Sequence, residues 1–111
     1  VFPKGVLSRG DKLTDVAIGR VFAEAGLKAS IVAPCGKTHY EFYSVSRQKP
    51  VHNNVSWFVM KSDDTNITIG EETDFIEGRF FPIEEALENI TYSQDRSLLM
   101  MAYQRYKEMA V

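Results

Sequence analysis

Apolar residues near the start of the chain recur every three to four positions. Positions three and four apart share one face of an α-helix, so this spacing predicts an amphipathic helix over residues 12–25. Gly26 is a typical stop signal, because glycine readily adopts the left-handed conformation in which many helices end. The stripe consists of Leu13, Val16, Ala17, Val21 and Phe22.

The middle of the chain has the patterns of β-strands. Residues 29–35 are apolar and partly β-branched, residues 38–47 alternate between two faces, and residues 55–61 form a further apolar stretch. These segments predict three strands. The intervening residues 49–54, KPVHNN, are rich in turn formers, so we expect them to join the second and third strands as a hairpin.

The last third predicts one more strand and two helices. Residues 75–83, FIEGRFFPI, are expected to form a strand that runs into Pro82. Proline is favoured in the first turn of a helix, which predicts a short helix over 83–89. Ser93 is a suitable N-cap for a final helix over about 94–109. This order of elements indicates an α+β fold with a mixed or antiparallel sheet.

Composition limits the class of protein. The 111 residues suit one domain, residues 1–111, and the contents of 44% hydrophobic and 25% charged residues are ordinary for a globular protein. With a net charge of −2, an anionic ligand would have to be held by a local cluster of cations. No apolar run reaches the roughly 18 residues of a membrane span, and VFPKGVLSRG lacks a signal-peptide pattern. Nothing in the sequence indicates a compartment, an oligomeric state or a membrane partner.

The spacing of residues 5–27 resembles a known catalytic signature. The Nudix hydrolases share the pattern G-x5-E-x7-R-E-U-x-E-E-x-G-U, where U is a bulky aliphatic residue. Gly5 matches its first glycine, Asp11 stands at its first glutamate, and Gly26 with Leu27 ends it without a gap. The resemblance implies a Nudix-like α/β/α sandwich with a mixed sheet.

Further stretches extend this resemblance over most of the chain. The PKG at 3–5 is similar to the opening of the signature in Nudix enzymes that act on diphosphoinositol polyphosphates and dinucleoside polyphosphates, and EEAL at 84–87 is similar to the end of many Nudix domains. At least one strand normally precedes the signature, yet here it begins at residue 5. Either the chain is a fragment, or that strand has been lost or comes from elsewhere. The sheet would then expose an edge.

The charges of the signature depart from the family pattern. In the family, three helical glutamates gather on one face and bind the divalent metal that activates water. Their positions hold Arg20, Ala23 and Glu24, and Gly19 replaces the family's arginine. A cation about 4–5 Å from a divalent ion costs several kcal/mol at an effective dielectric constant of about 20, which opposes metal binding. Alternatively, Arg20 forms an ion pair with Asp11 that braces the loop against the helix.

If the site is active, the resemblance implies Mg²⁺ or Mn²⁺ held by Glu24 and Asp11. Glu72, from the acidic loop that also holds Glu71 and Asp74, would supply a further catalytic carboxylate. The alternative interpretation is a solvated loop. A substrate phosphate would be bound beside the signature and the next strand, and the candidate residues are Lys4, Gly5, Lys37 and His39. These cations are equally compatible with scattered surface charge.

Two hypotheses follow from these residues. The first is a catalytically weak or inactive pseudoenzyme that keeps the Nudix fold to bind a protein, an RNA or an anionic phosphate-containing small molecule. The second is an active metal-dependent hydrolase of phosphoanhydrides, with diphosphoinositol polyphosphates, dinucleoside polyphosphates or capped RNA as substrates. Glu24 is the residue on which the active hypothesis depends.

Overall fold

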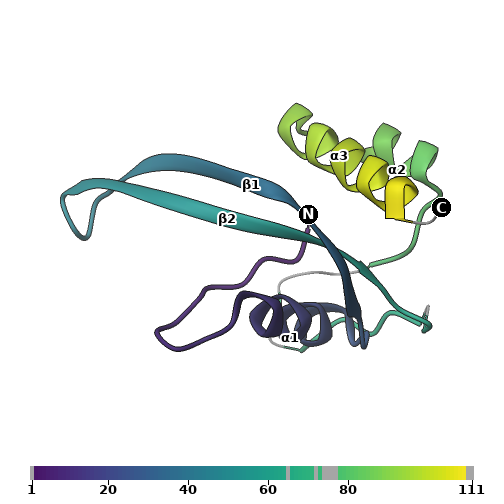
Figure 1. Ribbon diagram of the computed structural model, residues 1–111. Coiled ribbons are helices and arrows are strands. Elements are labelled where there is room, and N and C mark those ends of the chain that lie inside the picture. The colour runs from purple at the N-terminus through teal and green to yellow at the C-terminus, as the bar shows by residue number, and fades with distance from the viewer. Residues whose placement is uncertain (1, 65, 72, 74–77, 110–111) are drawn as a thin grey trace.

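The chain folds around one long β-hairpin with helices on both sides (Figure 1). The computed structural model describes residues 2–64, 66–71, 73 and 78–109. Helix α1 lies on one side of the hairpin, and α3 with the short α2 lies on the other. The fold is therefore α+β, with the helix–sheet–helix layering of a Nudix-like domain. In chain order the elements are α1 (Leu13–Ala25), β1 (Ser30–Ser44), β2 (Lys49–Lys61), α2 (Ile83–Asn89) and α3 (Ser93–Met109).

Helix α1 confirms the prediction made from the apolar stripe. It ends at Gly26, which has the left-handed φ of 69° and donates its backbone N–H to the carbonyl oxygen of Phe22 at 2.9 Å. The stripe is less buried than expected, because the side chains of Leu13 and Phe22 remain about half exposed. The pattern therefore identified the helix correctly but overstated how much of its apolar face is covered.

The two predicted strands before the hairpin turn are one continuous strand. The sequence suggested a break between residues 35 and 38, but β1 continues through it with two register shifts, between Ile31 and Ala33 and between Pro34 and Gly36. Such bulges accommodate an extra residue and bend the strand without ending the pairing. Gly36, with φ of 125°, supplies backbone freedom at the second shift.

The predicted turn at 49–54 is wrong. These residues belong to β2, and the chain reverses at residues 45–48. Gln48 makes the reversal with a φ of 53°, a left-handed conformation that glycine or asparagine usually supplies. The actual turn therefore lacks the residues that usually indicate a turn. Such residues, Pro50 and two asparagines, instead occur inside β2. From Gly36 to Ser44 the pairing with β2 is regular and antiparallel.

The C-terminal helices confirm their predictions, and α3 begins at Ser93 itself. The strand predicted over 75–83 is not found in its described part: residues 78–82 form no strand, and residues 75–77 lie outside the described residues. Gly78 instead packs on the side chains of Ile67 and Ile69. Across the described residues the sheet has two antiparallel strands, which is the antiparallel and not the mixed alternative of the prediction. None of the described helices is long and apolar enough to cross a membrane.

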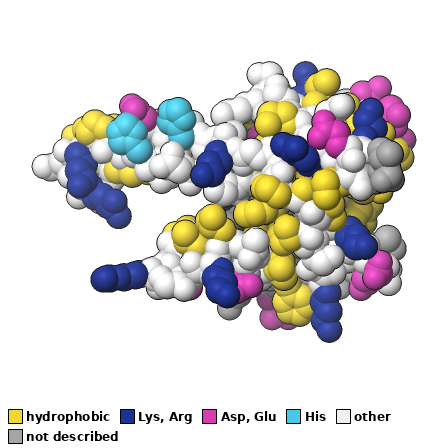
Figure 2. Space-filling model, in the orientation of Figure 1, with side chains coloured by type: hydrophobic (Ala, Val, Ile, Leu, Met, Phe, Trp, Pro, Cys, Tyr) yellow, Lys and Arg dark blue, Asp and Glu magenta, His cyan; other side chains and the backbone are white. Residues whose placement is uncertain are grey.

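The core is small. It lies where α1 and α3 cover the near half of the hairpin, which is the half that contains the start of β1 and the end of β2. The far half, which contains the turn at residues 45–48, projects beyond the helices (Figures 1 and 2). Its apolar side chains are consequently left in contact with solvent. The buried apolar residues among those described are Leu27, Ala33, Cys35 and Leu98.

Candidate functional site

The loop that precedes α1 packs tightly on the helix. A Cβ atom added to Gly5 would lie 3.0 Å from Cγ1 of Val16 and 3.5 Å from Cβ of Arg20. Only a glycine lets the backbone approach this closely. Farther along the loop, Asp11 Oδ2 accepts a hydrogen bond of 2.9 Å from the backbone N–H of Ser8. Gly5 therefore allows the loop to lie directly against the helix.

The C-terminal end of α1 is held by the segment that follows the hairpin. The N–H of Thr68 donates to the carbonyl oxygen of Ala25 at 2.8 Å, and that of Gly70 donates to Glu24 at 3.2 Å. These bonds satisfy carbonyl groups that a helix end leaves without partners. A side chain at Gly70 would collide with the carbonyl oxygen of Ala23. The approach of this segment to the helix is therefore as close as backbone atoms allow.

This contact places the start of the acidic loop, at Glu71, next to the end of the signature helix. Glu71, directly after the docked segment, is exposed. Glu72 and Asp74, of which Glu72 was the predicted additional catalytic carboxylate, lie outside the described residues.

Glu24 is buried and paired with Arg20. Its relative exposure is 6%, and its Oε2 lies 2.8 Å from Nε of Arg20, whose side chain is 44% exposed. Although the two atoms are close, Oε2 accepts no hydrogen bond with acceptable geometry from the described residues. The contact is thus an ion pair that leaves hydrogen-bonding capacity of the carboxylate unused. Arg20 is paired within the helix, and the alternative bridge to Asp11 is not present among the described ion pairs.

The donor set of the helix does not resemble a divalent-metal site. Mg²⁺ takes hard oxygen ligands, usually from more than one carboxylate or from a substrate. Here Gly19 and Ala23 offer no side-chain donor, and Arg20 places a cation on the remaining carboxylate. Among the residues that the structure describes, no group of three histidine, cysteine, aspartate or glutamate side chains could hold a metal ion. The residues of the helix therefore do not fit a catalytic metal.

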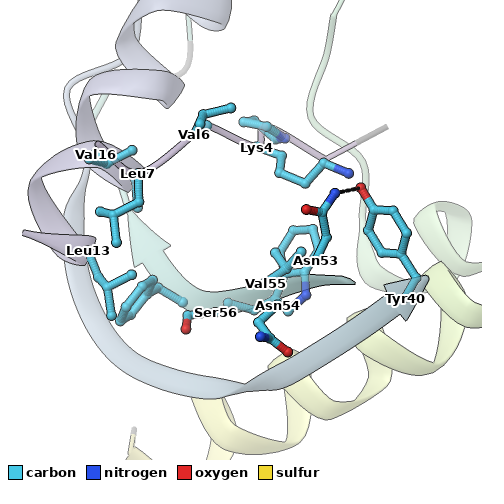
Figure 3. Close-up of a pocket in the computed structure, with 15 residues that line it drawn as sticks. Lys4, Val6, Leu7, Leu13, Val16, Tyr40, Asn53, Asn54, Val55 and Ser56 are labelled. Atoms are coloured by element: carbon cyan, nitrogen blue, oxygen red, sulfur yellow. Dashed lines mark hydrogen bonds between the residues drawn. The ribbon is translucent and has the colours of Figure 1, made fainter. Parts of the chain in front are cut away.

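A groove of about 370 Å³ opens beside the signature (Figure 3). It is lined by residues 3–7, by the first half of α1 and by residues 53–58 of β2. Lys4 and Tyr40 lie at one end, while Leu13 and other apolar side chains of the loop and helix lie at the other. Lys4 is the only charged residue among the described residues that line it.

The polar end of the groove is held in shape by side-chain contacts. Lys4 Nζ lies 5.5 Å from the centre of the Tyr40 ring, and Asn53 Nδ2 donates to the Tyr40 hydroxyl at 2.9 Å. Trp57 Nε1 donates to Oγ1 of Thr38 at 2.9 Å. Nothing in the sequence pattern singles out Tyr40 or Asn53. They could have been found only with the correct strand register, which pairs Tyr40 with Asn53.

The other predicted phosphate contacts lie elsewhere. Lys37 and His39 alternate with Tyr40 along β1, so they point to the opposite face of the hairpin and do not join Lys4 in the groove. On that opposite face, His52 Nδ1 lies 3.1 Å from Oε1 of Glu41 (Figure 2, cyan and magenta on the hairpin). The predicted cations therefore do not form one cluster in the structure. Of these residues, Lys4 lies at the groove, and Lys37 and His39 do not.

Comparison with known proteins gives a family match. Residues 1–101 match the family profile described as NUDIX domain. A protein of Mycobacterium tuberculosis (strain CDC 1551 / Oshkosh), named "Putative mutator protein MutT4", is 28% identical over 100 residues. The matched region is 90% of this chain and 39% of that protein, so the chain spans about two fifths of its relative's length.

Proposed function

The chain belongs to the Nudix family, and we propose that it acts as a binding module whose metal-dependent hydrolase site has been largely dismantled. The observation that carries this proposal is the ion pair between Arg20 and Glu24. Glu24 is the one carboxylate left at the three positions where the family places its metal-binding glutamates. Its charge is already balanced by a cation of the same helix.

Electrostatics support this assignment. A divalent ion at Glu24 would have to displace the Arg20 guanidinium or share the carboxylate with it. Sharing places like charges a few ångströms apart in a partly buried site, where repulsion is stronger than in water. Displacement removes the partner of a buried carboxylate, which also costs free energy. Both routes weaken metal binding relative to a helix with three glutamates.

The groove beside Lys4 is the proposed ligand site. Its one cation lies next to the aromatic ring of Tyr40, with Trp57 farther along β2. A lysine is a suitable contact for a phosphate group, and aromatic rings offer flat surfaces for a base or another ring. We therefore propose an anionic phosphate-containing small molecule, or a phosphate of RNA, as the ligand.

A second function, hydrolysis of phosphoanhydrides with Mg²⁺ or Mn²⁺, is favoured by one observation. Glu24 Oε2 is buried and retains unused hydrogen-bonding capacity, which a metal ion or a water molecule would satisfy. The acidic loop also begins next to the end of α1. The following assay distinguishes the two functions.

The decisive experiment measures hydrolysis. The protein is incubated with Mg²⁺ or Mn²⁺ and a panel of diphosphoinositol polyphosphates, dinucleoside polyphosphates and capped RNA, alongside a Glu24→Gln variant. The binding-module proposal predicts no difference between the two proteins. Metal-dependent turnover that is lost in Glu24→Gln would establish the hydrolase instead.

A second experiment rebuilds the carboxylates. Arg20→Glu with Ala23→Glu restores the family pattern, and calorimetry should then detect Mn²⁺ binding that the unchanged protein lacks. The matched control is Arg47→Glu with Ser46→Glu, which changes the net charge equally at the exposed hairpin turn. Circular dichroism establishes that each variant is folded. Equal Mn²⁺ binding by the folded control would contradict the assigned register of the signature.

The ligand site is tested by titration with inorganic tripolyphosphate and with a dinucleoside polyphosphate. Removing a charged hydrogen-bond donor should weaken binding about tenfold, so Lys4→Ala should raise the dissociation constant by that factor. Lys37→Ala removes the same charge from the opposite face of the hairpin and should leave the constant unchanged. Equal weakening by both variants would indicate unspecific attraction and reject the groove as the site.

A further inference from the structure

The two edges of the hairpin differ in what covers them. The N-terminal segment, residues 2–7, passes along β2: Phe2 lies 6.0 Å from the Trp57 ring, and residues 3–7 share the groove with residues 53–58. Helix α3 packs on β1 at Gly36 through Met101, but the described backbone hydrogen bonds of residues 36–44 go to β2 and to no other described segment. The outer edge of β1 therefore presents backbone groups without a protein partner in the described structure.

We propose that this edge pairs with the same edge of a second copy of the chain. The two β1 strands would run antiparallel about a two-fold axis at His39, and the two hairpins would form one four-stranded sheet. An exposed edge of a long strand is a template for such pairing, and a two-fold interface uses the same patch on both copies. This inference is independent of the proposed function of the groove.

Charge complementarity selects the register. With the axis at His39, Lys37 of each copy lies opposite Glu41 of the other, which gives two equivalent pairs of opposite charge. Opposite charges at directly facing positions stabilise paired strands, and like charges destabilise them. An axis at residue 37 would place Lys37 opposite Lys37, and an axis at 41 would place Glu41 opposite Glu41. The charges along β1 thus favour the register centred at His39 over these two.

The other face of the strand supplies apolar contact in the same register. Phe42, which is exposed, falls opposite Gly36 of the second copy, which has no side chain of its own. Met101 lies over Gly36 in each copy and is itself exposed, so the incoming Phe42 ring meets a methionine. Thioether and aromatic groups make favourable contacts. The pairing therefore covers apolar side chains that the separate chain leaves in water.

Charge reversal tests the pairing. Sedimentation velocity over a range of concentrations should show a monomer–dimer equilibrium. Lys37→Glu or Glu41→Lys should each raise the dissociation constant about tenfold, because two attractive pairs become repulsive. The double variant Lys37→Glu with Glu41→Lys should restore dimerisation. Lys49→Glu, the same change on β2, should have no effect.

A cysteine cross-link tests the register directly. In a Cys35→Ser background, His39→Cys places two thiols opposite each other at the axis, where a short bifunctional thiol reagent should join the two chains. Asn54→Cys is the matched control, because Asn54 faces His39 on the same side of the hairpin but on the other edge. A protein that stays monomeric, a dimer that both single charge variants leave intact, or equal cross-linking of both cysteines would overturn the proposal.

Discussion

The two halves of the hairpin have similar sequence patterns but different surroundings. In the near half, Ala33 and Cys35 are buried. In the far half, which projects beyond them, Phe42, Tyr43 and Val45 have exposed fractions of 45%, 63% and 81%. The alternation of residues makes both halves a strand, whereas the helices decide which half becomes core. Substitutions should therefore affect stability in the near half and association in the far half.

The largest expected effect is on the helix that covers the near half. Leu98 of α3 is buried and lies beside Thr38 and Trp57. Replacing a buried leucine by alanine loses transfer free energy and leaves a cavity, so Leu98→Ala should lower the free energy of unfolding by about 3 kcal/mol. Phe42→Ala in the far half should change it by less than about 0.5 kcal/mol. Urea denaturation of the separate chain, at a concentration where it is monomeric, measures both; similar losses would contradict the comparison.

The next effect concerns the segment that holds α1. Gly70→Ala places a Cβ against the carbonyl oxygen of Ala23, so the segment must move away and weaken its hydrogen bonds to the helix end. Forced overpacking of this kind should lower the free energy of unfolding by about 2 kcal/mol. The same denaturation experiment measures it, and an unchanged midpoint would mean that the close approach is absent in solution.

Gly19→Ala is the opposite case on the same helix. A Cβ at Gly19 meets no atom within 4 Å, and glycine inside a helix is less favourable than alanine. The variant should therefore raise the free energy of unfolding by about 1 kcal/mol. The measurement is thermal denaturation monitored by circular dichroism at 222 nm, which reports helix content. A destabilised variant would show that Gly19 has a contact or conformation that α1 does not account for.

The smallest effect concerns the buried thiol of the near half. Burial raises the pKa of Cys35 above 9.0, and the nearby Arg105 partly opposes this shift. Because the folded protein then holds this proton more tightly than the unfolded chain, stability is present in full below pH 9 and falls as pH rises beyond it. Cys35→Ser should show a smaller loss of stability over that pH range. An identical pH dependence in both proteins would contradict the raised pKa.

The sequence was sufficient for the helices because their signals are local. The apolar stripe with Gly26 located α1, and Pro82 and Ser93 located the starts of α2 and α3 to within one residue. The hairpin turn was missed because Gln48, not a glycine or an asparagine, adopts the left-handed conformation. Gln48 adopts a conformation that glutamine disfavours, and the pairing of β1 with β2 stabilises it. That pairing is not a local signal in the sequence.

The candidate site was predicted in part for the same reason. The spacing from Gly5 to Leu27 predicted the family, which the profile match confirms. The ion-pair partner of Arg20 could not be decided from the sequence, because the path of the loop was unknown and either Asp11 or Glu24 could lie next to the guanidinium. In the structure Asp11 already accepts the Ser8 N–H, and Glu24 lies one turn along the helix. The residues of the groove required the register of the strands, which the misplaced turn concealed.

The pair of Arg20 and Glu24 also bears on how this helix can evolve. Changing Arg20 to glutamate alone would leave two carboxylates one turn apart with no cation between them, at a position where Glu24 is buried. Changing Ala23 to glutamate alone would add a carboxylate while Arg20 still neutralises its neighbour. Substitution of Arg20 is therefore the more costly of the two steps, because it leaves Glu24 buried without its counter-charge.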